Sequence, residues 1–209
     1  MITDIHTHYN IDHALRNVRF ASDSMSLPGI GLCSVGIHPW DVNDESETLM
    51  PQLESLARDQ RVVAIGETGL DRVCGSDFTL QQAVFLRHIQ LSEKLCKPLV
   101  IHMVRTAQEV IAAHRHLSPH MAWMVHGFRG NANVARMLVN EGILLSVGER
   151  FNTEAVKSVP IDMLLLETDE STMPIEDIAS RVADARGVAT DEMLQWASAN
   201  ARRFLSTDC

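Results

Sequence analysis

The sequence predicts an α/β protein built as a compact (β/α)8 TIM barrel. Short apolar runs alternate with longer helical patterns, as expected when crossover helices join parallel strands. Eight such runs occur, at residues 2–5, 17–21, 31–37, 62–65, 99–101, 122–125, 143–147 and 163–166. A closed barrel is typically ~250 residues long, with short examples near ~200. A chain of 209 residues therefore predicts trimmed loops and helices.

The helices between the runs carry their own start and stop signals. Thr79 and Gln82 form a capping-box pattern, and the helix that follows must end before Pro98. Apolar residues then recur at helical spacing up to Leu95. Further helices are expected at residues 107–116, 133–140 and 190–205.

The composition favours a single soluble, cytoplasmic domain over residues 1–209. A hydrophobic content of 45% supports one sizeable core, and no linker or low-complexity segment divides the chain. No secretory signal is visible, and no apolar run approaches the ~20 residues of a membrane span. The four cysteines form no CxxC pair, which favours free thiols in a reducing compartment.

The charge balance restricts how the protein can meet a nucleic acid. The chain has 18 Lys and Arg against 27 Asp and Glu, a formal charge of -9. This argues against a broad basic surface that coats nucleic acid. It leaves open a narrow site where bound metals supply the positive charge.

Metal-ligand residue types gather where the apolar runs end. His6 and His8 follow the first run, and residues i and i+2 of a strand point to the same side, so both imidazoles can face one ion. The C-terminal ends of parallel barrel strands share one rim. Six ligands are too many for one catalytic zinc with an open position, but they suit two ions ~3.5–4 Å apart. The predicted ligands are His6, His8, Glu67, His102, His126 and Asp169.

Each of these residues, taken alone, also has a structural interpretation. A buried His at a strand end is commonly a hydrogen-bonded core residue, Glu67 could cap a helix, and Asp169 could be an N-cap. Burying so many titratable groups together on one rim would cost free energy of folding unless a metal ion were bound there. The second His-x-His, at His114 and His116, lies in a helical pattern where i and i+2 do not face each other. His13, His88 and His120 are likewise expected to be structural.

The motifs at the run ends resemble the TatD family of metal-dependent deoxyribonucleases, within the amidohydrolase superfamily. The short length and the segment Gly-Glu-Arg-Phe-Asn at 148–152 resemble its compact bacterial subgroup. The resemblance extends nearly from end to end. It rests on Asp-Ile-His-Thr-His at 4–8, Gly-Ile-His-Pro-Trp at 36–40, Gly-Glu-Thr-Gly-Leu-Asp at 66–71, Leu-Val-Ile-His at 99–102, Val-His-Gly-Phe-Arg-Gly at 125–130 and Leu-Glu-Thr-Asp at 166–169.

The resemblance implies a barrel that holds two divalent ions (Zn, Mn or Mg) and hydrolyses phosphodiester bonds. It implies one ion among His6, His8, Glu67 and Asp169, and a second among Glu67, His102 and His126. Glu67 would bridge them, in the place where many amidohydrolases use a carbamylated Lys. The segments after His102 and after Asp169 depart from the family pattern, so the substrate contacts are less well supported than the metal ligands.

We assign catalytic roles to Asp169, which would accept the proton of the attacking water, and to bridging Glu67. Arg105 and Arg129 are candidates to hold phosphate oxygens, and surface salt bridges are an equally good interpretation of both. His38 is a candidate to hydrogen bond the substrate or a metal ligand.

The expected function is therefore a nuclease for which nucleic acid, preferably DNA, is a substrate rather than a stable partner. The protein is expected to be a monomer or weak oligomer without membrane contact. One alternative is a binuclear enzyme that hydrolyses a small ester, lactone or phosphate. The other is a metal-dependent binding or scaffold protein that has lost catalysis.

Overall fold

The computed structural model describes residues 2–20, 27, 29 and 31–206. Its eight strands are parallel and follow the order β1 to β8 in a closed barrel, which confirms the predicted fold class. The strands are β1 (Asp4–Thr7), β2 (Ala14–Arg19), β3 (Cys33–Gly36), β4 (Val62–Asp71), β5 (Leu99–Val104), β6 (Trp123–Val125), β7 (Leu144–Val147) and β8 (Leu164–Leu166).

From β3 onward, each strand is followed by at least one helix. They are η1 (Pro39–Asp41), α1 (Ser46–Ala57), α2 (Phe78–Leu95), α3 (Ala107–Leu117), α4 (Ala132–Asn140), α5 (Thr153–Ser158), η2 (Ile161–Met163), α6 (Ile175–Arg186) and α7 (Thr190–Leu205). Residues 8–13, between β1 and β2, form no helix. This is one of the trimmed connections that the chain length predicted.

The chain divides into two compact units, which are described separately. Residues 1–16 and 124–206 form one, the N/C unit, and residues 17–123 form most of the other, the middle unit. The single domain expected over residues 1–209 stays a prediction.

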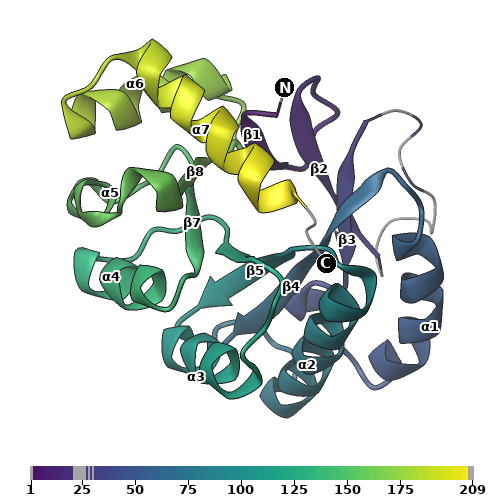
Figure 1. Ribbon diagram of the computed structural model, residues 1–209. Helices are drawn as coiled ribbons and strands as arrows, with labels where there is room; N and C mark the ends of the chain where they lie inside the picture. The colour runs from purple at the N-terminus through teal and green to yellow at the C-terminus, as the bar shows by residue number, and fades with distance from the viewer. Residues whose placement is uncertain (1, 21–26, 28, 30, 207–209) are drawn as a thin grey trace. The chain divides into compact units, whose positions relative to one another are not determined.

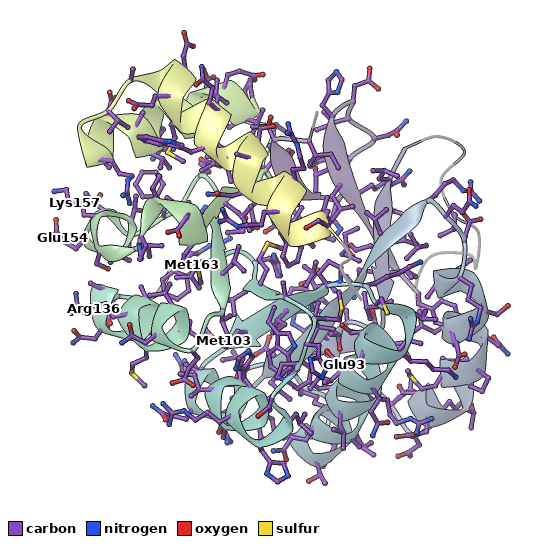
Figure 2. All side chains as sticks on the ribbon, viewed as in Figure 1. Glu93, Met103, Arg136, Glu154, Lys157 and Met163 are labelled. Atoms are coloured by element: carbon purple, nitrogen blue, oxygen red, sulfur yellow. The ribbon has the colours of Figure 1, made fainter. Side chains whose placement is uncertain are left out.

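In the N/C unit, β8 lies between β1 and β7. Asp4 pairs with Leu166, and Leu145 pairs with Leu164. Helix α7 begins and ends where the sequence predicted, and its buried residues include Met193, Ala197, Ala201 and Phe204. Figure 2 shows polar side chains on the outer faces of α4 and α5, where Arg136, Glu154 and Lys157 are exposed.

In the middle unit, β4 pairs with both β3 and β5, and α2 packs against β4 and β5 (Figure 1). The predicted capping box is wrong, because Asp77 caps α2 by accepting a hydrogen bond from the Leu80 N–H. The structural interpretation of His88 is confirmed. The ring is buried, its Nδ1 lies 2.8 Å from Val84 O, and its Nε2 accepts the Ile37 N–H at 3.0 Å.

Several strands run past the limits of the apolar runs. The second strand begins at Ala14 rather than at residue 17, and Ala21, the end of that predicted run, lies outside the described residues. The largest difference is in β4, which continues to Asp71, so Glu67 lies within a strand instead of after one. The β4–β5 register shifts between Ile65 and Thr68, and such a bulge can re-aim the side chains beside it.

The cysteines only partly match the expectation of free thiols. Cys33 and Cys74 are thiols, but Cys96 is disulfide-bonded, so the prediction was wrong for Cys96. Spacing along the chain does not reveal which thiols the fold brings together. Among the described residues, no helix is both long and apolar enough to cross a bilayer.

Candidate active site

The N/C unit gathers four of the six predicted ligands at the ends of β1, β6 and β8. Ligand atoms of His6, His126 and Asp169 all lie within 4.8 Å of one another. The rings of His6 and His126 are 4.2 Å apart between centroids, and His6 is fully buried. His8 Nε2 lies 3.5 Å from Asp169 Oδ1, so His8 reaches the same group.

The backbone of β1 holds Asp169 in place. The Asp169 N–H donates to His6 O at 2.9 Å, and the His8 N–H donates to Asp169 O at 3.2 Å. Asp169 has a φ of 53°, a left-handed conformation that Asp tolerates better than most residues. The segment that supplies both imidazoles, the end of β1 and the residue after it, therefore also fixes the carboxylate.

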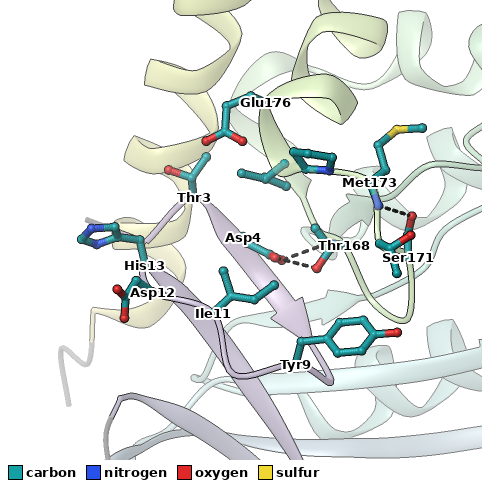
Figure 3. Close-up of a pocket in the computed structure, with 13 residues that line it drawn as sticks. Thr3, Asp4, Tyr9, Ile11, Asp12, His13, Thr168, Ser171, Met173 and Glu176 are labelled. Carbon is teal, nitrogen blue, oxygen red and sulfur yellow. Dashed lines mark hydrogen bonds between the residues drawn. The ribbon is translucent and has the colours of Figure 1, made fainter.

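Asp4 anchors the residue just before Asp169 (Figure 3). Its Oδ1 accepts the Thr168 N–H at 3.0 Å, and its Oδ2 accepts the Thr168 hydroxyl at 2.7 Å. Burial raises the pKa of Asp4 to about 6, against the opposing effect of these hydrogen bonds. Asp4 also borders a cavity of about 660 Å³ that Tyr9, Ile11 and Met173 help to line.

Glu167 stands behind His126 and was given no role from the sequence. Its Oε1 lies 3.5 Å from His126 Nδ1 and accepts the Gly127 N–H at 2.6 Å. The residue is fully buried. A carboxylate behind a metal-binding His fixes the ring and raises its basicity. Its place two residues before Asp169, in the Leu-Glu-Thr-Asp motif, was the available sequence signal.

The middle unit gathers Glu67, His102 and His38. Glu67 Oε1 lies 2.9 Å from His38 Nε2 and 2.9 Å from His102 Nδ1. Ligand atoms of the three residues all lie within 4.8 Å of one another, and Glu67 is only 2% exposed. The structure thus brings the two predicted ligands of this unit together and adds His38 to them.

Asn17 holds the other side of Glu67. Its Nδ2 donates to Glu67 Oε2 at 2.9 Å, and its Oδ1 accepts the Glu67 N–H at 3.0 Å. This pair of bonds fixes the orientation of the carboxylate inside the strand. Sequence reasoning missed Asn17, although a polar residue at the start of an apolar run was a usable signal.

Asp71 plays the same part for His102 that Glu167 plays for His126. Asp71 Oδ2 lies 3.2 Å from His102 Nε2 and accepts the Trp40 indole N–H at 2.8 Å. Burial works to raise the pKa of Asp71, but the hydrogen bonds from Trp40, the Val73 N–H and His102 hold it below its ordinary value. The sequence motif contained Asp71, but its role was not recognised.

His38 is oriented by its own loop. The Trp40 N–H donates to His38 Nδ1 at 3.1 Å, so the neutral ring carries its proton on Nε2, which then donates to Glu67. Burial lowers the pKa of His38, which favours this neutral form. The structure therefore places His38 against a predicted metal ligand.

The two predicted phosphate-binding arginines lie in different surroundings. Arg129 Nη2 is 3.9 Å from Asp169 Oδ2, and its side chain is more than half exposed. Arg129 and Arg150 both line a cavity of about 180 Å³ next to Asp169. Arg105 is exposed just past β5 and has a φ of 56°. Their substrate-binding roles stay predictions, and Arg150 is an addition that the sequence did not suggest.

The donor sets of both clusters fit divalent metal ions. The donors are imidazole nitrogens and carboxylate oxygens, which suit Zn²⁺ and similar ions. When Asp71 accepts the His102 Nε2 proton, His102 Nδ1 presents a lone pair to Glu67 Oε1.

The sequence is similar to known metal-dependent hydrolases. A family model described as TatD related DNase matches residues 5–206. An uncharacterized metal-dependent hydrolase of Buchnera aphidicola is 34% identical over 164 residues, which cover 73% of this chain and 62% of the relative. The chain thus matches less than two thirds of that relative's length. Escherichia coli YcfH, also an uncharacterized metal-dependent hydrolase, is 29% identical over 198 residues, 84% of this chain and 74% of YcfH.

Solved structures share the fold. The crystal structure of YjjV, a TatD homolog from Escherichia coli, matches with a TM-score of 0.80 and 21% identity over 97% of both chains. An uncharacterized amidohydrolase from Saccharomyces cerevisiae matches with a TM-score of 0.68 and 17% identity, over 83% of this chain and 80% of the other. At these identities the likeness concerns the fold alone.

Proposed function

The chain belongs to the TatD-related DNase family of metal-dependent hydrolases, and we propose that it hydrolyses phosphodiester bonds in nucleic acid, preferably DNA. The observation that carries the proposal is the pair of imidazole–carboxylate clusters, each backed by a further carboxylate. A carboxylate in this place orients the ring and raises its basicity, as a metal-binding histidine requires.

We further propose that the protein binds two divalent ions through the six predicted ligands. The support comes from the sequence, because the motifs that contain the six ligands resemble those of a family whose members bind two divalent ions. His6, His8 and Asp169 would hold one ion and His102 and His126 the other, with Glu67 shared. Two ions in such a centre would supply an activated water and offset phosphate charge.

The chain's own residues would divide the remaining work. Asp169, with its backbone fixed by β1, would accept the proton from the attacking water. Arg129 and Arg150, which line the cavity beside Asp169, would bind phosphate oxygens. Asn17 and Asp71 would hold Glu67 and His102 in their binding orientations.

One observation favours a second candidate function. The formal charge of -9 does not favour a long polyanion, so hydrolysis of a small ester, lactone or phosphate at the same centre is the alternative. The segment after Asp169 also departs from the motif of the family that the sequence resembles. The cytoplasmic location and the monomeric or weakly oligomeric state stay predictions.

A comparison of substrates tests the proposed function. Metal-free protein is reloaded with Mg²⁺, Mn²⁺ or Zn²⁺ and assayed on end-labelled single-stranded DNA and RNA, on simple phosphate esters and on lactones. We expect metal-dependent cleavage of the oligonucleotides, with DNA preferred. Turnover of lactones or monoesters alone would favour the alternative, and no turnover of any ester class would favour the scaffold protein.

A further inference from the structure

We propose that Trp40 is a stacking residue for a planar aromatic ring of the substrate, a nucleobase beside the scissile phosphodiester. The inference rests on the proposed function and adds a specificity-determining residue to it. Trp40 lies in η1, directly after β3, and 56% of the residue is exposed. The exposed indole offers a ligand a large, rigid aromatic face.

The orientation of the indole is fixed before any ligand arrives. Its N–H donates to Asp71 Oδ2 at 2.8 Å, and the Arg19 guanidinium lies over the ring, 5.8 Å from its centroid. Arg19 is itself held by two-oxygen contacts to Asp41, at 2.7 and 2.8 Å from Nη2. A ring that is held in this way loses little conformational freedom when a ligand stacks on it.

The indole lies at the edge of the metal-binding cluster of the middle unit. Its ring centroid is 4.9 Å from that of His38 and 6.0 Å from that of His102, and both contacts are edge-on. A nucleobase and its own phosphate are only a few ångströms apart. A base stacked on Trp40 would therefore place its phosphate beside Glu67 and His102.

A cleft next to the indole has room for such a ring. Its volume is about 590 Å³, within the range of about 300–1,000 Å³ that small-molecule sites occupy. Trp40, Val42 and Val73 supply its apolar wall, and Val73 is 62% exposed. The Asp71 carboxylate at its border already accepts hydrogen bonds from Trp40 and the Val73 N–H. Asp71, Cys74 and Ser76 line the rest of the cleft, so its wall is part apolar and part polar. The exposed face of the indole supplies the stacking surface, which accepts any base.

The test compares wild type, Trp40→Phe and Trp40→Leu on matched oligonucleotides. The two oligonucleotides of a pair have the same sequence, except that one carries an abasic nucleotide in place of the terminal normal nucleotide. One pair is made for the 5′ end and one for the 3′ end. Both variants lose the hydrogen bond to Asp71, so the comparison is between substrates: we expect Trp40→Leu to raise KM about tenfold more on the normal substrate than on the abasic one, at the lower end of what base stacking contributes. Trp40→Phe keeps a ring, so its KM should stay close to wild type.

Equal KM changes on the normal and abasic substrates would overturn the stacking role, as would similar behaviour of the Phe and Leu variants. If the wild-type protein does not cleave oligonucleotides at all, the proposed function is contradicted instead. In that event, calorimetric binding of dAMP and of deoxyribose 5-phosphate to the metal-loaded proteins decides. Tighter binding of dAMP that is lost only in Trp40→Leu supports stacking on Trp40, and equal binding by all three proteins overturns it.

Discussion

Asp71 Oδ2 lies 3.2 Å from His102 Nε2 and accepts the Trp40 indole N–H at 2.8 Å, so one carboxylate oxygen joins a predicted metal ligand to an exposed aromatic ring. When Asp71 accepts a proton from His102 Nε2, the lone pair of Nδ1 faces Glu67. The geometry of the middle unit therefore depends on Asp71 as much as on the ligands themselves.

Replacing Asp71 by Asn should weaken metal binding, because the amide no longer provides the negative charge that fixes the His102 ring and raises its basicity. We expect the affinity for Zn²⁺ to fall about 10–100-fold, measured by competition with a chelating dye. The matched control is Glu109→Gln, which removes a carboxylate that pairs with Arg72 on the surface of the same unit. Equal metal affinity of Asp71→Asn and wild type would contradict this role.

Replacing Asp169 by Ala should abolish hydrolysis while the protein stays folded. The side chain is the proposed proton acceptor as well as a ligand, and we expect kcat to fall at least about 10²–10⁴-fold. Circular dichroism checks the fold, and Glu154→Gln on the exposed face of α5 serves as the control. Wild-type turnover by a metal-replete Asp169→Ala protein would remove Asp169 from the mechanism.

His88 should make stability depend on pH between about 4 and 6.5. Burial lowers the pKa of His88 to about 4, whereas the unfolded ring binds a proton below 6.5. The unfolded state therefore holds more protons in this window, and the free energy of unfolding falls as the pH falls through it. The full loss below pH 4 is roughly 3 kcal/mol.

Urea unfolding of wild type and His88→Gln at pH 7.5 and pH 4.5 measures this effect. We expect the difference between the two pH values to be smaller in the variant, since Gln does not titrate. An identical pH dependence in the two proteins would show that His88 does not carry it.

Gly69 should resist substitution, because β4 and β5 approach each other closely there. Its φ is +139°, and an added Cβ would collide with the carbonyl oxygen of His102. We expect Gly69→Ala to lower the free energy of unfolding by about 3 kcal/mol or more. Gly75→Ala is the control, since a Cβ there meets nothing within 4 Å. Equal unfolding midpoints in urea would refute the close-approach argument.

The fold class and the metal-binding residue types could be predicted from the sequence because both are local patterns. An apolar run predicts a strand, and a His or carboxylate at its end is visible in the same few residues. The predicted end of β4 was wrong, because the strand continues past Glu67 to Asp71. The bulge beside Glu67 depends on pairing with β5, which a local pattern does not show.

The residues behind the ligands could not be predicted in the same way. Asn17 is 50 positions from Glu67, and Asp71 is 31 positions from His102. Such pairs form only when neighbouring strands are in register, which no short pattern reveals. Trp40 was visible in the Gly-Ile-His-Pro-Trp segment, but its link to Asp71 depends on how η1 meets the end of β4.

The most direct test of a two-ion centre is a metal titration of hydrolysis. Metal-free protein receives increasing equivalents of Mn²⁺, and the rate of cleavage of a labelled DNA oligonucleotide is measured at each step. We predict that the rate rises to a plateau at two equivalents per chain. A plateau at one equivalent, or a rate that does not respond to metal, would contradict the account.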